Sequence, residues 1–170
     1  DHALYDTERG SNFVIHSNAT AAQDNYTPLL NDMSNAFTST GFDLNTATGI
    51  TNNENYIYAS WSFRKQKGFF DVKKVTKSSG SNLVVDFSDL GSLGFVAAKY
   101  LGAQDWICWC KGMTSTHHLK FNTTDASSSG NYMTVSGTSV TLIDGAFSSG
   151  DSVIYAWADG DDSSAQIFGD

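Results

Sequence analysis

The cysteines and histidines are the residues of this sequence best suited to binding a metal or forming a disulfide. They occur as Cys108-Trp109-Cys110 and His117-His118. Residues two apart on a β-strand point to one face with their Cα atoms about 6.5–7 Å apart, which suits a disulfide badly. Zinc needs four ligands, and adjacent histidines on a strand project to opposite faces. We therefore expect structural or free thiols, surface histidines and no metal at these residues.

Oxygen ligands gather near the end of the sequence, in Asp159-Gly160-Asp161-Asp162. Such carboxylates could hold calcium, but the twelve-residue spacing of an EF-hand is absent. An ordinary turn rich in Asp and Gly is the favoured interpretation. Calcium at residues 159–162 is the alternative, and no other cofactor is expected.

Enzymatic chemistry finds little support. The sequence contains no G-x-S-x-G elbow, no H-E-x-x-H, no P-loop and no dinucleotide-binding glycine pattern. Sixteen Asp residues make close carboxylate pairs inevitable, so such a pair would not by itself indicate a glycosidase. We expect no catalytic residues.

Aromatic side chains could instead stack on the rings of a carbohydrate. The candidates are Trp106, Trp109, Tyr132 and Trp157, and Tyr155 is a further aromatic residue that could contribute. Trp106 and Trp109 fall on opposite faces of one strand, so at least one of them belongs to the core. Large aromatics at alternating positions pack more often than they bind, so a carbohydrate platform is the alternative rather than the main expectation.

The elements that must position these residues are strands. Ser (22), Thr (16), Asn (12) and Gly (15) are abundant while Glu occurs twice and Pro once, so helix formers are scarce. Apolar residues make up 40% and charged residues 16%, which favours a folded chain. The net charge of −8 argues against a nucleic-acid partner, and no apolar run approaches the ~18 residues of a membrane span. The first residue is Asp1 rather than Met, which indicates a processed chain or a fragment.

Alternating apolar residues, separated by clusters of Gly, Ser, Asn and Asp, predict an all-β fold of antiparallel sandwiches. One exception is a short helix over residues 26–37, opened by Pro28. The predicted strands are 3–5, 13–17, 41–44, 56–63, 69–76, 82–87, 94–101, 105–110, 117–122, 132–135, 140–143 and 152–158.

Comparing the sequence with itself reveals a repeat. The segments that match at a spacing of 104 are 1–5 with 105–109 and 15–22 with 119–126. Those that match at slightly shorter spacings are 42–44 with 140–142, at 98, and 57–59 with 154–156, at 97. We therefore expect two tandem β-sandwich (jelly-roll-like) modules, a first over residues 1–68 that is incomplete at its N-terminal side and a complete second over residues 69–170.

The first module has no counterpart of three strands of the second, 69–76, 82–87 and 94–101. A sandwich without them exposes sheet edges and an apolar face. Strands from upstream in a longer polypeptide, strands from another subunit, or packing of the first module against the second would cover that surface. Strand donation between identical chains is head-to-tail and forms an open filament when the rotation does not close.

Charge is distributed unevenly along the chain. Six of the ten Lys and Arg lie within residues 64–77, while the last 27 residues contain six Asp and no base. Such a dipolar chain favours head-to-tail contact, although exposed ion pairs contribute only about 0–1 kcal/mol each. Two solvated faces that never meet are the favoured interpretation of the charge pattern alone, and head-to-tail contact is the alternative. The residues expected at an assembly contact are Asp1, His2, Ala3, Leu4, Tyr5, Arg64, Lys65, Lys67, Lys73, Lys74, Asp159, Asp161 and Asp162.

Four phrases of the sequence resemble a known family. They are Gly94-Phe95-Val96-Ala97-Ala98-Lys99, Asp105-Trp106-Ile107-Cys108-Trp109, Leu119-Lys120-Phe121-Asn122-Thr123-Thr124-Asp125-Ala126 and Val153-Ile154-Tyr155-Ala156-Trp157. Together they resemble a β-rich domain of unknown function that recurs in tandem in structural and tail-fibre-like proteins of marine and environmental bacteriophages. The resemblance implies an extracellular or virion-surface protein without catalytic residues. We expect a structural protein that assembles with itself into a fibrous or helical homo-oligomer, and the alternative is a lectin-like module that binds glycans.

Three Asn-x-Thr sequons could carry glycans. They begin at Asn18, Asn25 and Asn122, and the first and third are equivalent in the repeat. Chance sequons are expected in a chain so rich in Ser, Thr and Asn, and those of a phage protein would be bare. Glycosylation is therefore the alternative to unmodified surface turns.

Overall fold

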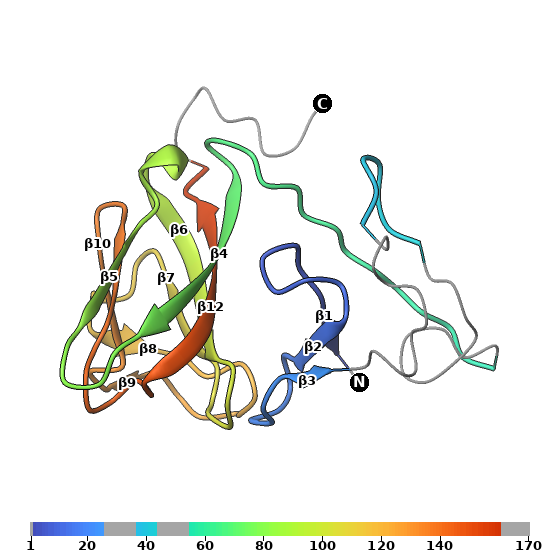
Figure 1. Cartoon of the computed structure of the whole chain (residues 1–170). Coiled ribbons are helices and arrows are strands. Elements are labelled where there is room, and N and C mark those ends of the chain that lie inside the picture. The colour runs from blue at the N-terminus through green and yellow to red at the C-terminus, as the bar shows by residue number, and fades with distance from the viewer. Residues whose placement is uncertain (1, 26–36, 44–54, 161–170) are drawn as a thin grey trace.

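The computed structural model describes residues 2–25, 37–43 and 55–160 (Figure 1). Apart from one 3₁₀ turn, η2 (Ser88–Leu90), the regular elements in these residues are antiparallel β-strands, so the fold is all-β as predicted. The strands are β1 (Ala3–Leu4), β2 (Phe13–His16), β3 (Asp24–Asn25), β4 (Phe70–Lys77), β5 (Leu83–Asp86), β6 (Leu93–Tyr100), β7 (Ile107–Cys110), β8 (His117–His118), β9 (Ser128–Ser129), β10 (Met133–Ser136), β11 (Ser139–Leu142) and β12 (Gly150–Ala158).

A four-stranded sheet in the order β4-β12-β6-β7 forms the centre of the fold. Strand β12 pairs with β4 on one side and with β6 on the other. Its residues Val153, Ile154, Tyr155 and Ala156 are each at most 5% exposed, so both faces of the sheet are covered here. A strand buried on both faces needs a continuous apolar run, which these residues provide.

One face of this central sheet packs against a second sheet in the order β10-β11-β5. Both sheets contribute side chains to one buried apolar cluster, which we call core one. Core one contains Val85, Phe87, Leu90, Leu93, Val96, Ala98, Ile107, Met133, Val135, Val140, Leu142, Phe147, Ile154, Ala156 and Ala158.

The opposite face of the central sheet is covered by the N-terminal sheet β1-β2-β3. Their shared apolar cluster, core two, contains Ile15, Phe70, Val72, Ala97, Leu101, Trp106, Cys108, Val153 and Tyr155. Backbone hydrogen bonds join the loop between β2 and β3 to the loop between β6 and β7: the Gln23 N–H donates to the Leu101 carbonyl (2.8 Å), and the Gln104 N–H donates to the Thr20 carbonyl (3.0 Å). The N-terminal strands are therefore docked on the central sheet by apolar contacts and by backbone hydrogen bonds.

Strand pairings recur at the spacings found in the sequence. The pairs that correspond at a spacing of 104 are Leu4–Ile15 with Cys108–Leu119, Phe13–Asn25 with His117–Ser129, and Val14–Asp24 with His118–Ser128. At a spacing of 98, the Phe37–Phe42 bridge corresponds to the Val135–Val140 pair. Segments that share a sequence pattern thus share their pairing register.

Most predicted strands form, with ends shifted by a few residues, as is usual for strand boundaries. The segment predicted as a strand at 56–63 is exposed and belongs to no strand. The physical reason is that a strand needs neighbours for its backbone hydrogen bonds, and the β4 and β6 strands that flank the matching β12 are already occupied by β12. Strands β3 and β9 were not predicted because each consists of only two polar residues, which show no alternation of apolar and polar side chains. The predicted helix over 26–37 lies outside the described residues except at Phe37.

Candidate functional site

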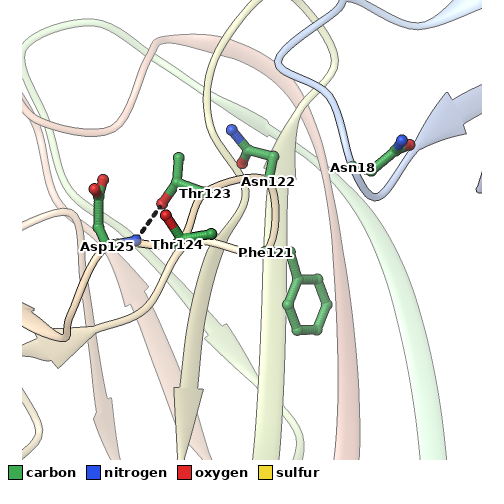
Figure 2. Close-up of a pocket in the computed structure, with 6 residues that line it drawn as sticks. All are labelled: Asn18, Phe121, Asn122, Thr123, Thr124 and Asp125. Atoms are coloured by element: carbon green, nitrogen blue, oxygen red, sulfur yellow. Dashed lines mark hydrogen bonds between the residues drawn. The ribbon is translucent and has the colours of Figure 1, made fainter.

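A shallow pocket lies between the turn after β2 and the turn after β8, which are equivalent in the repeat. It is lined by Asn18, Phe121, Asn122, Thr123, Thr124 and Asp125. Figure 2 shows Asn18 on the N-terminal segment, across from a single loop that supplies the other five residues. Because Asn18 and Asn122 are 104 residues apart, the same Asn-x-Thr phrase borders the pocket from both copies of the repeat.

Phe121 is the aromatic residue of this pocket. Its side chain stacks on Phe95, with ring centroids 5.5 Å apart, and lies 6.1 Å from Trp106. These contacts hold the ring in place while the residue remains 47% exposed. An open aromatic ring beside amide, hydroxyl and carboxylate groups suits a neutral polar ligand such as a sugar.

Asn122 is held at both ends of its amide. Its Oδ1 accepts a hydrogen bond from the backbone N–H of Trp106 (2.9 Å), and its Nδ2 donates to Asp105 Oδ1 (2.7 Å). Asp105 also pairs with Lys120 (2.7 Å), and the hydrogen bond from Lys120, with that from Asn122, lowers the pKa of the Asp105 carboxyl. The amide nitrogen that would bear a glycan is thus engaged in Asn122, whereas Asn18 and Asn25 are exposed.

The four aromatic residues predicted to bind carbohydrate are not brought together. Trp106 is fully buried, and its Nε1 donates to the His16 carbonyl (2.8 Å), so no ligand ring can stack on it. Half-buried Trp109 and Tyr132 pack at core one, whereas half-buried Trp157 packs at core two. On the central sheet, period-two alternation sends Trp109 of β7 and Trp157 of β12 to opposite faces. Exposed Phe121 was missed because its place follows from the loop after β8 and not from strand alternation.

A buried polar network joins the N-terminal segment to the central sheet. Arg9 Nε donates to Asp6 Oδ2 (2.5 Å), and the Tyr155 hydroxyl donates to the same oxygen (2.5 Å). The guanidinium also donates to the carbonyls of Leu4 (2.9 Å) and Phe13 (3.3 Å). Burial raises the pKa of Tyr155 above its ordinary value. Nothing in the sequence spacing indicates this network, because Tyr155 lies far along the chain from the other two residues.

The basic and acidic residues predicted for assembly partly pair within the chain. Lys74 pairs with Asp151 (3.0 Å), and buried Lys77 pairs with Asp144 (2.6 Å). The other intrachain pairs are Lys65 with Glu8 and Asp71, Lys73 with Asp71, and Lys111 with Asp159. Among the remaining assembly residues, Arg64 and Lys67 are exposed, His2 is exposed, and Ala3, Leu4 and Tyr5 are half-buried. Asp1, Asp161 and Asp162 lie outside the described residues.

The residues suited to metal or disulfide chemistry lie near β7 and β8. Cys108 and Cys110 are both free thiols, and burial raises the pKa of Cys108. The prediction of surface histidines is wrong for His118, which is 2% exposed. Its ring packs edge-on against Tyr132 (4.9 Å), and its Nε2 lies 3.2 Å from Ser128 Oγ. Burial lowers the pKa of His118.

Within residues 2–25, 37–43 and 55–160, no three His, Cys, Asp or Glu side chains gather as a metal site would require. No helix in this part of the chain is long and apolar enough to cross a membrane. Comparisons with protein-family models, with curated proteins and with solved structures found no match.

Proposed function

We propose that this chain is a non-enzymatic structural protein, a subunit of a phage tail fibre or a related helical filament at an extracellular or virion surface. In this proposal it consists of two tandem, jelly-roll-like β-sandwich modules, residues 1–68 and 69–170. Support for the second sandwich comes from core one, to which two antiparallel sheets both contribute. Support for a tandem arrangement comes from the strand pairings that recur at spacings of 104 and 98.

The observation that carries the proposal is the exposure of apolar residues whose counterparts are buried. Ile57 is 102% exposed, whereas Ile154 is 0% exposed. Phe42 is 40% exposed, whereas Val140 is 0% exposed. Trp61 adds a further exposed ring, at 81%. With Tyr56 and Tyr58, which are also exposed, Ile57 and Trp61 form a group of exposed apolar residues close together in the sequence. Clustered exposed apolar residues mark surfaces that associate with other chains.

The test is the size of the purified chain as a function of concentration, by light scattering after size exclusion and by negative-stain imaging. We expect oligomers or fibres whose population falls when Ile57→Asp or Trp61→Ser is introduced. Val84→Asp is the matched control, because Val84 is also an exposed apolar residue (63%) but lies on β5, away from the segment in question. A stable monomer at every concentration would contradict the proposal.

A second candidate function, lectin-like glycan binding, is favoured by the pocket at Phe121. Its test is a glycan array with the wild-type chain and with Phe121→Ala. Glycan binding that Phe121→Ala abolishes and Val84→Ala leaves intact would support it. Binding that survives Phe121→Ala would place the ligand elsewhere.

A further inference from the structure

The exposed segment around Ile57 is the counterpart of the central strand β12. Residues 57–59 have the same sequence, Ile-Tyr-Ala, as residues 154–156 of β12. At this spacing Ile57, Ala59 and Trp61 correspond to Ile154, Ala156 and Ala158, which all belong to core one. The segment thus has the alternation and residue types of a strand that is buried on both sides, yet in the described structure it is exposed.

The pairing of β12 specifies what such a strand requires. Ile154 lies opposite Lys73 of β4 and opposite Ala98 of β6, and Ala156 lies opposite Asp71 and Val96. A segment with the same central Ile-Tyr-Ala can use the same two neighbours, one equivalent to β4 and one equivalent to β6.

The pairing of strand β1 independently indicates a missing neighbour equivalent to β6. Leu4 pairs with Ile15, as Cys108 pairs with Leu119. On its other side Cys108 pairs with Ala97 of β6, whereas β1 is the edge strand of the sheet β1-β2-β3. In the second module β6 lies between β12 and β7. Because β1 corresponds to β7 and the segment at Ile57 corresponds to β12, one strand equivalent to β6 would pair with both of them.

The hairpin at residues 37–42 points to the same partner. Its bridging residues Phe37 and Phe42 are 36% and 40% exposed, while their counterparts Val135 and Val140 are buried in core one. In core one those valines share a cluster with Val85 of β5, Val96 and Ala98 of β6 and Ile154 of β12. The segment at Ile57, strand β1 and the hairpin at residues 37–42 therefore all lack the surface that β4, β5 and β6 form in the second copy.

We call strands β4, β5 and β6 together the β4–β6 unit. The chain's own β4–β6 unit cannot supply that surface. Strand β6 is paired on both edges, with β12 and β7, and the inner edge of β4 is paired with β12. A second copy of this chain has the same edges occupied, so it can cover Ile57 and Trp61 by apolar contact but cannot pair with residues 56–61 as β4 and β6 pair with β12. The partner must be a further β4–β6 unit whose place for a β12 strand is vacant.

We propose that residues 56–61 form a β-strand inserted between two strands of the β4 and β6 types, which belong to a further module of this same kind. Ile57 then lies opposite the equivalents of Lys73 and Ala98, and its side chain enters a core equivalent to core one. The same β6-type strand pairs with β1 at Leu4. This inference rests on the proposed modular function and names the partner of its exposed surface.

The test adds a second copy of residues 69–104 directly ahead of Asp1 in the full chain. Gln104 of the added copy then precedes Asp1, as it precedes the equivalent Asp105. Hydrogen exchange is measured by mass spectrometry on peptides that cover residues 56–62, in the original and the extended chain. We expect exchange at residues 57–61 to slow by at least about 100-fold on extension, since amides in central strands exchange only through large openings.

Two variants of the extended chain control the register. Ile57→Asp places a charge in the new core and should abolish the protection, whereas Ser62→Asp should leave it intact, because the counterpart of Ser62 is Asp159. A further control, Ala98→Pro in the added copy only, removes the pairing of the β6-type strand and should also restore fast exchange.

Fast exchange at residues 57–61 in the extended chain overturns the proposal, as does protection that survives Ile57→Asp. The outcome is separate from that of the assembly test. An unextended chain that stays monomeric contradicts the proposed function, while protection on extension would still establish the inserted strand. An unextended chain that forms fibres without protection on extension would support assembly but refute this partner.

Discussion

The buried network of Asp6, Arg9 and Tyr155 gives a quantitative test of how the N-terminal strands are fixed to the central sheet. The side chains of Arg9 and Asp6 are 0% and 6% exposed, and their closest atoms are 2.5 Å apart. The change Asp6→Asn preserves the shape of the side chain and removes its charge. The Arg9 guanidinium then remains buried without a counter-charge.

Removing one partner of a buried ion pair costs about 3–5 kcal/mol in the free energy of unfolding, because the other charge stays desolvated. At about 2–4 °C per kcal/mol for a chain of this size, Asp6→Asn should lower Tm by roughly 6–20 °C. Tyr155→Phe removes the short hydrogen bond to Asp6 and the longer one from Arg9 (3.3 Å) but leaves the ion pair in place, so it should cost less, about 1.5–3 kcal/mol. The ranking of the two variants is therefore as informative as the size of either effect.

The assay is urea unfolding followed by circular dichroism, with Tm from calorimetry. The matched control is the double variant Asp6→Leu with Arg9→Met, which removes both charges and should recover much of the loss. A cost below about 1 kcal/mol for Asp6→Asn, or a double variant that is less stable than Asp6→Asn, would contradict a desolvated ion pair between Asp6 and Arg9.

Three further outcomes are expected. Burial lowers the pKa of Lys99 to about 8 from its usual 10.5, so the unfolded chain binds this proton more tightly. The free energy of unfolding, measured by urea titration relative to Lys99→Met, should therefore rise between about pH 8 and pH 10.5. A difference that does not change with pH would contradict this. Native protein should react with one equivalent of a thiol reagent at half-buried Cys110, and buried Cys108 should react only after unfolding, so Cys110→Ser should abolish the native reaction. Gly94→Ala should cost about 1–3 kcal/mol by urea unfolding, because a Cβ there would lie 2.9 Å from the Ala158 carbonyl oxygen; unchanged stability would mean that β12 moves away freely.

The candidate binding pocket was only partly predictable. The repeat in the sequence makes Asn18 and Asn122 equivalent, but it could not show that the two turns border one pocket. That neighbourhood depends on how the N-terminal sheet docks on the central sheet. Phe121 becomes the open aromatic ring because Phe95 and Trp106 hold it in place while it stays exposed. Trp106 is excluded as a binding residue because it is fully buried.

The sequence alone determined the all-β class, the positions of most strands and the repeat, because alternation and turn residues are local properties and the repeat appears when the sequence is compared with itself. Tertiary structure alone decided which strands find partners. Ile154 and Ile57 each begin the sequence Ile-Tyr-Ala, yet Ile154 is buried on a strand between β4 and β6 whereas Ile57 is exposed. The phrase specifies a strand, but a strand forms only where other segments supply both hydrogen-bonding edges and an apolar face, and those segments lie far away in the chain.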